Sequence, residues 1–212
     1  FIHGAARIAR LLLTRAPAHA AATAASLRAQ GDDVLISPLL RIVPLPWQAP
    51  DVPIAGLIFT SANGVAVAAE ACAPWLGLPV YVVGTATARV AHQYGFAQVV
   101  HPAGVVDGQS LFDWLATQDF RAPLLHLTGR DQTTLHMPAG LQVETRAVYA
   151  AELEPQFTPE AAAALRAGDV DAVLLYSPRT ARHFATLYDA LAIGRDRLIL
   201  GVLSPAIAAA AG

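Results

Sequence analysis

The chain contains no lysine and only one cysteine. All of its 14 basic residues are arginine, which excludes a Schiff-base lysine and the lysine-containing phosphate loop Gly-x-x-x-x-Gly-Lys. Cys72 has no second thiol to pair with, so an intrachain disulfide and a cysteine-based metal site are both excluded. The patterns His-x-x-x-His and Gly-x-Gly-x-x-Gly are missing as well. We therefore expect no metal site, and the dinucleotide-binding class is disfavoured.

Long hydrophobic runs and an excess of charge are also missing. Apolar residues make up 55% of the chain, much of it alanine, but no run reaches the roughly 18 residues of a membrane-spanning helix. A formal net charge of −2 argues against a general nucleic-acid binder, which carries a basic surface. We see no signal peptide. We therefore expect a cytoplasmic protein that acts on a small molecule and binds neither nucleic acid nor membrane.

What the chain does contain is an internal repeat of an apolar strand, a hydroxyl-bearing tip and a helix start. The copies are Leu11–Arg15 with Leu125–Arg130, Gly56–Gly64 with Ala172–Thr180, and Tyr81–Thr87 with Leu200–Ala206. The offsets are 113, 116 and 119 residues, counted from Leu12 to Leu125, Ser61 to Ser177 and Thr85 to Ser204. A nearly constant offset indicates duplication. We therefore expect two similar α/β domains that face each other across a cleft.

Apolar strands alternate with helical segments along the chain, which is typical of parallel sheets built from βαβ units. Five expected strands fall within residues 51–149, enough for one doubly wound domain. Four more fall in the flanks, 1–38 and 156–212, which we assign to a second, discontinuous domain. Segments 39–50 and 150–155 then join the domains as a two-stranded linker. By the repeat, the flanking domain lacks a last strand and helix, which we expect to be missing from the C-terminal end.

The expected strand tips carry hydroxyl and arginine side chains. Ligands of open α/β sheets bind at the carboxyl ends of the strands, where hydroxyls cap helices and free backbone N–H groups hold anions. The residues at these tips are Thr14, Arg15, Thr60, Ser61, Asn63, Thr85, Thr87, Gly129, Arg130, Ser177, Arg179 and Ser204. A helix cap explains each hydroxyl taken singly. Their gathering at one cleft favours a binding site.

Two other side chains are candidates for chemistry. His126 lies in an apolar strand, and we interpret it as a satisfied core residue because a catalytic base needs an orienting partner. Tyr149 is expected to end a strand where the chain leaves the middle domain, which places its phenol close to the linker. The alternative for Tyr149 is simple packing of the ring at the domain junction.

The ordered set of these segments resembles the uroporphyrinogen-III synthase family over almost the whole chain. The matching segments are Leu11–Pro17, Gly56–Val65, Tyr81–Ala88, Val148–Tyr149 and Asp171–Pro178. The resemblance implies two flavodoxin-like domains joined by a two-stranded linker. It also implies a cyclising lyase that converts hydroxymethylbilane, a linear tetrapyrrole rich in carboxylates, to uroporphyrinogen III. Ring D is inverted and water is lost. We expect a monomer that needs no cofactor.

The resemblance also assigns roles to residues of this chain. Thr87 matches the threonine of the family's Gly-x-Ala-Thr turn, and Tyr149 matches its tyrosine before the linker. It implies that Tyr149 assists departure of the hydroxyl or stabilises the developing cation, and that Thr87 binds substrate carboxylates. The other strand-tip residues named above, together with Pro178, are the expected substrate-binding residues.

Two other classes of protein share this layout. A two-domain binding protein that closes on a small anionic ligand by hinge motion has the same duplicated architecture. A nucleotide-sugar or dinucleotide enzyme with two Rossmann-like domains is the other alternative, and the missing glycine pattern counts against it. The isomer formed from hydroxymethylbilane distinguishes all three.

Overall fold

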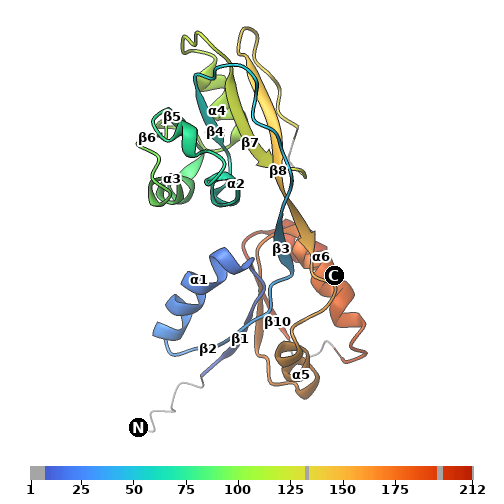
Figure 1. The fold of residues 1–212 in the computed structure, drawn as a ribbon. Coiled ribbons are helices and arrows are strands. Elements are labelled where there is room, and N and C mark those ends of the chain that lie inside the picture. The colour runs from blue at the N-terminus through green and yellow to red at the C-terminus, as the bar shows by residue number, and fades with distance from the viewer. Residues whose placement is uncertain (1–7, 132–133, 195–197, 212) are drawn as a thin grey trace. The chain divides into compact units, whose positions relative to one another are not determined.

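The structure is a computed structural model that describes residues 8–131, 134–194 and 198–211 (Figure 1). The chain divides into two compact units. Unit 1 takes the chain up to Arg41 and again from Glu152 onward, and unit 2 is Ile42–Ala151. Both units contain a parallel sheet with helices. The predicted α/β class with parallel sheets is therefore confirmed.

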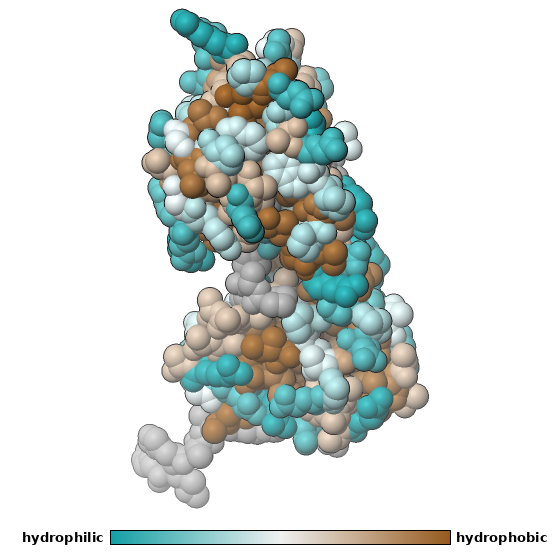
Figure 2. Space-filling view, viewed as in Figure 1, coloured by the Kyte–Doolittle hydropathy of each residue, from teal (hydrophilic) through white to brown (hydrophobic). Residues whose placement is uncertain are grey.

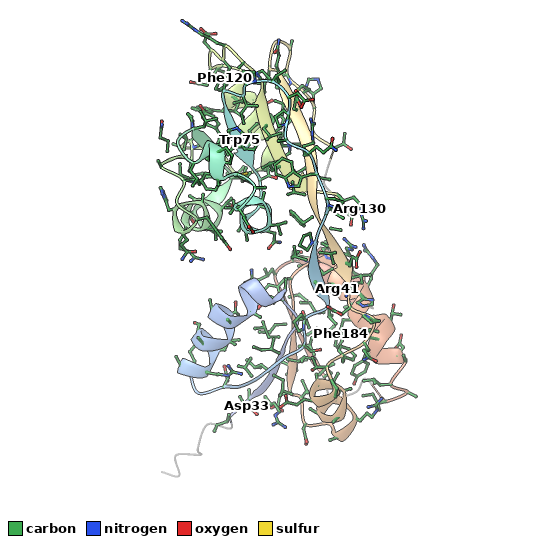
Figure 3. All side chains as sticks on the ribbon, in the orientation of Figure 1. Asp33, Arg41, Trp75, Phe120, Arg130 and Phe184 are labelled. Atoms are coloured by element: carbon green, nitrogen blue, oxygen red, sulfur yellow. The ribbon has the colours of Figure 1, made fainter. Side chains whose placement is uncertain are left out.

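Unit 1 is built on a four-stranded sheet in the order β10-β9-β1-β2, with all neighbours parallel. Its elements are β1 (Arg10–Leu13), α1 (Pro17–Ala29), β2 (Asp33–Ile36), α5 (Pro159–Ala167), β9 (Ala172–Leu175), α6 (Pro178–Asp189), β10 (Ile199–Val202) and α7 (Pro205–Ala211). In its core the ring of Phe184 (Figure 3) packs between Phe157 and Tyr188, with centroid distances of 5.6 and 5.5 Å. Such aromatic contacts add to the stability gained by burying the apolar faces of the helices.

Unit 2 has five parallel strands in the order β8-β7-β4-β5-β6. Its elements are β4 (Gly56–Phe59), α2 (Ala62–Ala68), a 3-10 turn (Ala73–Trp75), β5 (Pro79–Val82), α3 (Gly84–Gln93), β6 (Gln98–Val100), α4 (Gly108–Leu115), β7 (Leu124–Gly129) and β8 (Val143–Leu153). Every residue of β4 and β7 is buried. A separate apolar cluster packs on each face of the sheet, which explains why these strands read as unbroken apolar runs.

The chain passes between the units in two strands that lie side by side, β3 (Leu40–Pro44) and β8. The backbone N–H of Leu45 donates to the carbonyl of Val148 at 2.9 Å. Further along, Arg41 (Figure 3) forms an ion pair with Glu152 at 2.9 Å. The pairing expected between the two connecting segments is present, and β8 continues through the segment that was expected to begin a separate linker.

The sheets of the two units have the same spatial order once the repeats are matched. The repeat pairs β1, β9 and β10 with β7, β4 and β5, and these strands occupy equivalent places in the two sheets. β2 lies beside β1 as β8 lies beside β7. The register agrees as well, because Leu12 pairs with Val173 in unit 1 and Leu125 pairs with Leu57 in unit 2. Among the described residues, β6 has no counterpart in unit 1. The units are therefore circular permutations of one design.

No helix in the described part of the chain is long and apolar enough to cross a membrane. On the face drawn in Figure 2, hydrophilic and hydrophobic residues are intermixed over both units.

Candidate functional site

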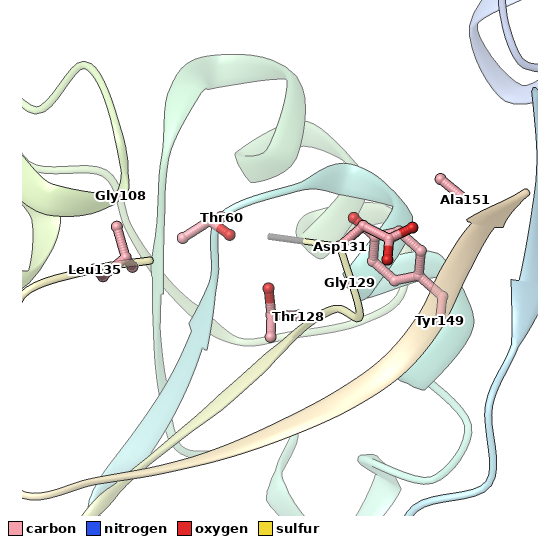
Figure 4. A pocket seen from close by; sticks show the side chains of 8 residues that line it. All are labelled: Thr60, Gly108, Thr128, Gly129, Asp131, Leu135, Tyr149 and Ala151. Atoms are coloured by element: carbon pink, nitrogen blue, oxygen red, sulfur yellow. The ribbon is translucent and has the colours of Figure 1, made fainter. Parts of the chain in front are cut away.

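A cavity of about 320 Å³ opens in unit 2 at the carboxyl ends of β4 and β7. The order of the strands reverses between these two neighbours, and such a switch point is where open α/β sheets bind ligands. The lining residues, drawn in Figure 4, are Thr60, Gly108, Thr128, Gly129, Asp131, Leu135, Tyr149 and Ala151. The cavity therefore has a wall of hydroxyls, a phenol and one carboxylate.

Thr60 and Thr128 form the hydroxyl wall. β4 and β7 pair in parallel with Ile58 opposite His126, so the residues two positions further on each strand lie on the same face of the sheet. Figure 4 shows both threonine hydroxyls pointing into the same space. A pair of neutral donors and acceptors suits the carboxylates or pyrrole N–H groups of a polar ligand.

Tyr149 reaches the cavity from within β8, and not from the end of a strand as predicted. The strand continues to Leu153 because its outer edge pairs with β3. A β-bulge lies at this point: Thr128 pairs with Ala147, whereas Gly129 pairs with Tyr149. The backbone N–H of Arg130 donates to the carbonyl of Tyr149 at 2.8 Å. The backbone of Tyr149 is thus fixed by the sheet.

Asp131 is the only acid among the described residues that line the cavity. Its Oδ1 lies 3.5 Å from Nε of Arg130 (Figure 3), and both side chains are about half exposed. An exposed pair of this kind contributes little to stability. The pair places a carboxylate in the cavity wall with the guanidinium of Arg130 beside it.

The first turn of α4 closes another side of the cavity. Asp107 and Ser110 form a capping box, in which the backbone N–H of Ser110 donates to the Asp107 carboxylate at 2.8 Å. This hydrogen bond lowers the pKa of Asp107 below its usual value. A Cβ on Gly108 would lie 3.3 Å from both terminal carbons of Leu135. The glycine therefore lets Leu135 cover the cavity.

Arg130 and four other predicted residues of unit 2 do not line the cavity. Ser61 caps α2 by accepting a hydrogen bond from the backbone N–H of Asn63 at 3.2 Å. In the first turn of α3, Thr85 is exposed and Thr87 is buried. The capping function of Ser61 is thus observed, and substrate binding by these five residues stays a prediction.

Unit 1 has the equivalent switch point between β1 and β9. The buried hydroxyl of Thr14 donates to the carbonyl of Leu174 at 2.7 Å and so ties these strands together. The guanidinium of Arg15 lies 4.6 Å from the centroid of the Tyr176 ring and donates to the hydroxyl of Thr23 at 3.2 Å. No acid in the described part of the chain forms an ion pair with Arg15. Where unit 2 has its cavity, unit 1 therefore presents an ordered cation.

The remaining predicted residues start two helices of unit 1. Ser177 caps α6 by accepting from the backbone N–H of Thr180 at 3.1 Å, and Pro178 occupies the first position of that helix. Arg179 is exposed on the same turn. The carbonyl of Ser204 accepts the first backbone hydrogen bonds of α7. Their contribution to binding stays a prediction.

Sequence reasoning missed five lining residues and Tyr176. Thr128 carried a usable signal, because the repeat pairs it with Thr14, which was selected. The others missed in the cavity wall are Gly108, Asp131, Leu135 and Ala151. Two of these, Asp131 and Leu135, come from the irregular segment after β7, whose path no hydrophobic period encodes.

His126 is buried in β7, as predicted, but its Nε2 has no hydrogen-bond partner among the described residues. The expectation of a satisfied core histidine is therefore wrong in that respect. Its ring meets Phe112 edge-on at 5.3 Å, and burial lowers its pKa from 6.5 to about 4. Burial also raises the pKa of Cys72 to about 12, so that thiol is unreactive. The described residues include no cluster of three or more His, Cys, Asp or Glu that could hold a metal ion.

Comparison with known proteins gives consistent matches. The family model of uroporphyrinogen-III synthase HemD matches residues 21–212. The uroporphyrinogen-III synthase of Synechococcus elongatus is 31% identical over 195 residues, covering 84% of this chain and 74% of the relative. The crystal structure of the uroporphyrinogen-III synthetase of Helicobacter pylori 26695 superposes with a TM-score of 0.62 at 16% identity, covering 95% of this chain and 87% of the other. The last match shows the shared fold.

Proposed function

Because this chain belongs to the uroporphyrinogen-III synthase family, we propose that it cyclises hydroxymethylbilane to uroporphyrinogen III, with loss of water and inversion of ring D. The main structural support for this proposal is the cavity at the β4–β7 switch point, which Tyr149 and Asp131 help to line. The product is a precursor of haem and related tetrapyrroles.

The chemical task is mainly one of steering. The bilane closes without enzyme to the uninverted isomer I, so the protein must favour attack at the substituted carbon of ring D. Holding reacting groups in one geometry can lower a barrier by several kcal/mol. The hydroxyls of Thr60 and Thr128 and the phenol of Tyr149 converge on a single cavity. These neutral groups can form hydrogen bonds that fix the orientation of a ring of the substrate, and the reaction leaves them unchanged.

Tyr149 and Asp131 have complementary roles in this proposal. When the carbon–oxygen bond of the hydroxymethyl group breaks, the oxygen takes a proton and leaves as water, while positive charge develops on the bilane. The phenol of Tyr149 donates a hydrogen bond to the departing oxygen. The carboxylate of Asp131 stabilises the cation, because a fixed opposite charge acts most strongly where charge develops. The new carbon–carbon bond to the substituted carbon of ring D passes the positive charge to that ring. The original bond between ring D and its meso carbon then breaks and re-forms at the free carbon of the ring, which inverts it. Loss of one proton to water balances the proton taken by the departing oxygen.

The substrate carboxylates need a different set of partners. Arg15 suits this task, because its planar guanidinium offers paired donors to a carboxylate and its stack on Tyr176 limits its motion. Backbone N–H groups in the first turn of α3, close to Thr85 and Thr87, provide a second set of donors. We assign carboxylate binding to these groups, together with Ser61 at the start of α2 and Ser177 and Arg179 at the start of α6.

The proposal also places the protein in the cytoplasm as a monomer. Cell fractionation tests the location, and light scattering coupled to gel filtration tests the mass of the particle, for which 22.2 kDa is expected of a single chain.

The experiment that tests the function is incubation of the purified protein with freshly made hydroxymethylbilane. The porphyrinogens are oxidised and isomers I and III are separated by chromatography, with heat-inactivated protein as the control. Isomer III is expected with native protein only. Formation of isomer I alone would contradict the proposal and favour the hinge-closing binding protein. The matches described above, which name synthases, favour the enzyme.

A further inference from the structure

The position of the Tyr149 ring against Gly129 supports one inference, which rests on the proposed function and extends it. We propose that Gly129, together with the β-bulge opposite it, is a positioning residue that holds the Tyr149 phenol in the cavity. Because Gly129 has no Cβ, the ring of Tyr149 can occupy the space that a side chain would fill. Its own backbone was expected to bind substrate, which is a different role.

The bulge places the side chain of Tyr149 on the face of the sheet opposite to the one it would occupy in a regular strand. Consecutive residues of a strand point to opposite faces. Here Val148 is the unpaired residue between the pairs Thr128–Ala147 and Gly129–Tyr149. As a result Val148 and Tyr149 both contact the same apolar cluster, on the face covered by α2 and α3. The ring therefore reaches the cavity, at the edge of the sheet, from the side opposite the face that carries Thr60 and Thr128.

Gly129 supplies the space that the re-aimed ring occupies. A Cβ at this position would lie 2.8 Å from Cζ, 3.0 Å from Cε2 and 3.0 Å from the hydroxyl oxygen of Tyr149. These atoms form the hydroxyl end of the ring of Tyr149, which lines the cavity. The backbone N–H of Arg130 fixes the Tyr149 carbonyl at 2.8 Å, so an added methyl group must move the ring and not the strand. Alanine at 129 therefore displaces the phenol while the sheet is kept.

Gly56 provides a matched control in the same unit. A Cβ there would lie 2.7 Å from the carbonyl oxygen of Pro79, so Gly56→Ala also introduces a buried clash. Gly56 begins β4 and thus lies at the opposite end of the strand from the cavity. Gly56→Ala separates the effect of a general packing defect from the effect of displacing Tyr149.

The test compares Gly129→Ala, Tyr149→Phe, the double variant and Gly56→Ala in the isomer assay, measuring kcat, KM and the ratio of isomers III and I. Gly129→Ala and Tyr149→Phe are each expected to lower kcat roughly 10- to 100-fold, as for loss of one hydrogen bond to a developing charge. The double variant is expected to match the single ones, because both changes remove the same interaction. Gly56→Ala is expected to keep kcat per folded molecule and the isomer ratio.

Two outcomes separate failure of the inference from failure of the site assignment. Wild-type kcat and isomer ratio for Gly129→Ala, with Tyr149→Phe impaired, overturn the inference alone. Wild-type kcat for Tyr149→Phe removes the role of the phenol itself. Should Gly129→Ala not fold, urea unfolding of Gly129→Ala in a Tyr149→Ala background decides. The inference expects stability to return when the ring is absent, and an undiminished defect would overturn it.

Discussion

The guanidinium of Arg15 stacks on the ring of Tyr176, 4.6 Å from its centroid, at the switch point of unit 1. The two residues follow neighbouring strands, β1 and β9. Burial raises the pKa of the Tyr176 phenol and the charge of Arg15 lowers it, with burial the larger effect. The ring therefore stays neutral and serves as a platform for the cation. The repeat thus produces an open cavity in unit 2 and an ordered positive charge in unit 1.

Substitution of Arg15 is expected to weaken substrate binding. Arg15→Gln removes one charged partner of a carboxylate, which typically costs about 1.5–3 kcal/mol, or about ten-fold or more in KM. Arg15→Lys keeps the charge but loses the planar fork and the stack, so an intermediate KM is expected. Steady-state kinetics measure both. Arg166→Gln, at the exposed end of α5, is the control with unchanged KM. An Arg15→Gln enzyme with wild-type KM would remove Arg15 from the binding site.

Ser61 allows its capping and binding roles to be separated. Ser61→Ala removes the cap of α2 and is expected to lower the free energy of unfolding by about 1 kcal/mol. Ser61→Asp keeps an acceptor for the N–H of Asn63 and suits the positive end of the helix. Its charge is nevertheless expected to repel a substrate carboxylate by about 1 kcal/mol, or about five-fold in KM. Urea unfolding and KM values check the two effects. If Ser61→Asp leaves KM unchanged, the residue is a cap only.

Substitution of Asp131 is expected to lower kcat without raising KM. Asp131→Asn removes the negative charge while keeping the shape of the side chain, so stabilisation of the developing cation is lost. We expect kcat to fall about ten-fold, less than for a fully buried group, because the carboxylate is partly exposed. KM is expected to fall or stay the same, since repulsion of the polyacid substrate decreases. A rise in KM at constant kcat would show that Asp131 acts in binding instead.

His126 makes stability depend on pH. Its pKa is 6.5 as an ordinary histidine and about 4 in the fold, so between these values the unfolded chain binds a proton that the folded chain excludes. The contribution of neutral His126 is complete above pH 6.5. As the pH falls to 4, about 3 kcal/mol of stability is expected to be lost. Asp107, whose pKa lies below 3.8, titrates outside this window.

Urea unfolding between pH 4 and 7 measures this effect. His126→Leu fills the same apolar site without an orphaned nitrogen and is expected to remove the slope. The exposed His101 provides the control, because His101→Gln should keep the slope of the wild type. An unaltered slope in His126→Leu would show that other groups cause it.

The repeat in the sequence predicted the fold well because each copy corresponds to one structural unit of the sheet. Each copy is a strand, a tip and a helix start, and such units assemble into the same sheet order twice, with the register Leu12–Val173 matched by Leu125–Leu57. Strand ends were less predictable. β8 runs past Tyr149 because β3 pairs with its outer edge, a long-range contact that no local pattern contains.

The site was predicted in part for a similar reason. Thr60 and Gly129 were found because strand tips of parallel sheets meet at one edge. The bulge that seats Tyr149 depends on the register between two strands, and Asp131 enters the cavity through an irregular loop. Both features arise from tertiary packing, which hydrophobic periodicity does not encode.

The fraction of isomer III that wild-type protein and Tyr149→Phe form from hydroxymethylbilane, at equal concentrations and times, tests the central claim most directly. The account predicts mainly isomer III from the wild type. For Tyr149→Phe, at equal stability in urea, it predicts mainly isomer I, because spontaneous closure overtakes the slowed enzyme. Equal fractions of isomer III from both proteins would contradict the assignment of the β4–β7 cavity as the place where ring closure is steered.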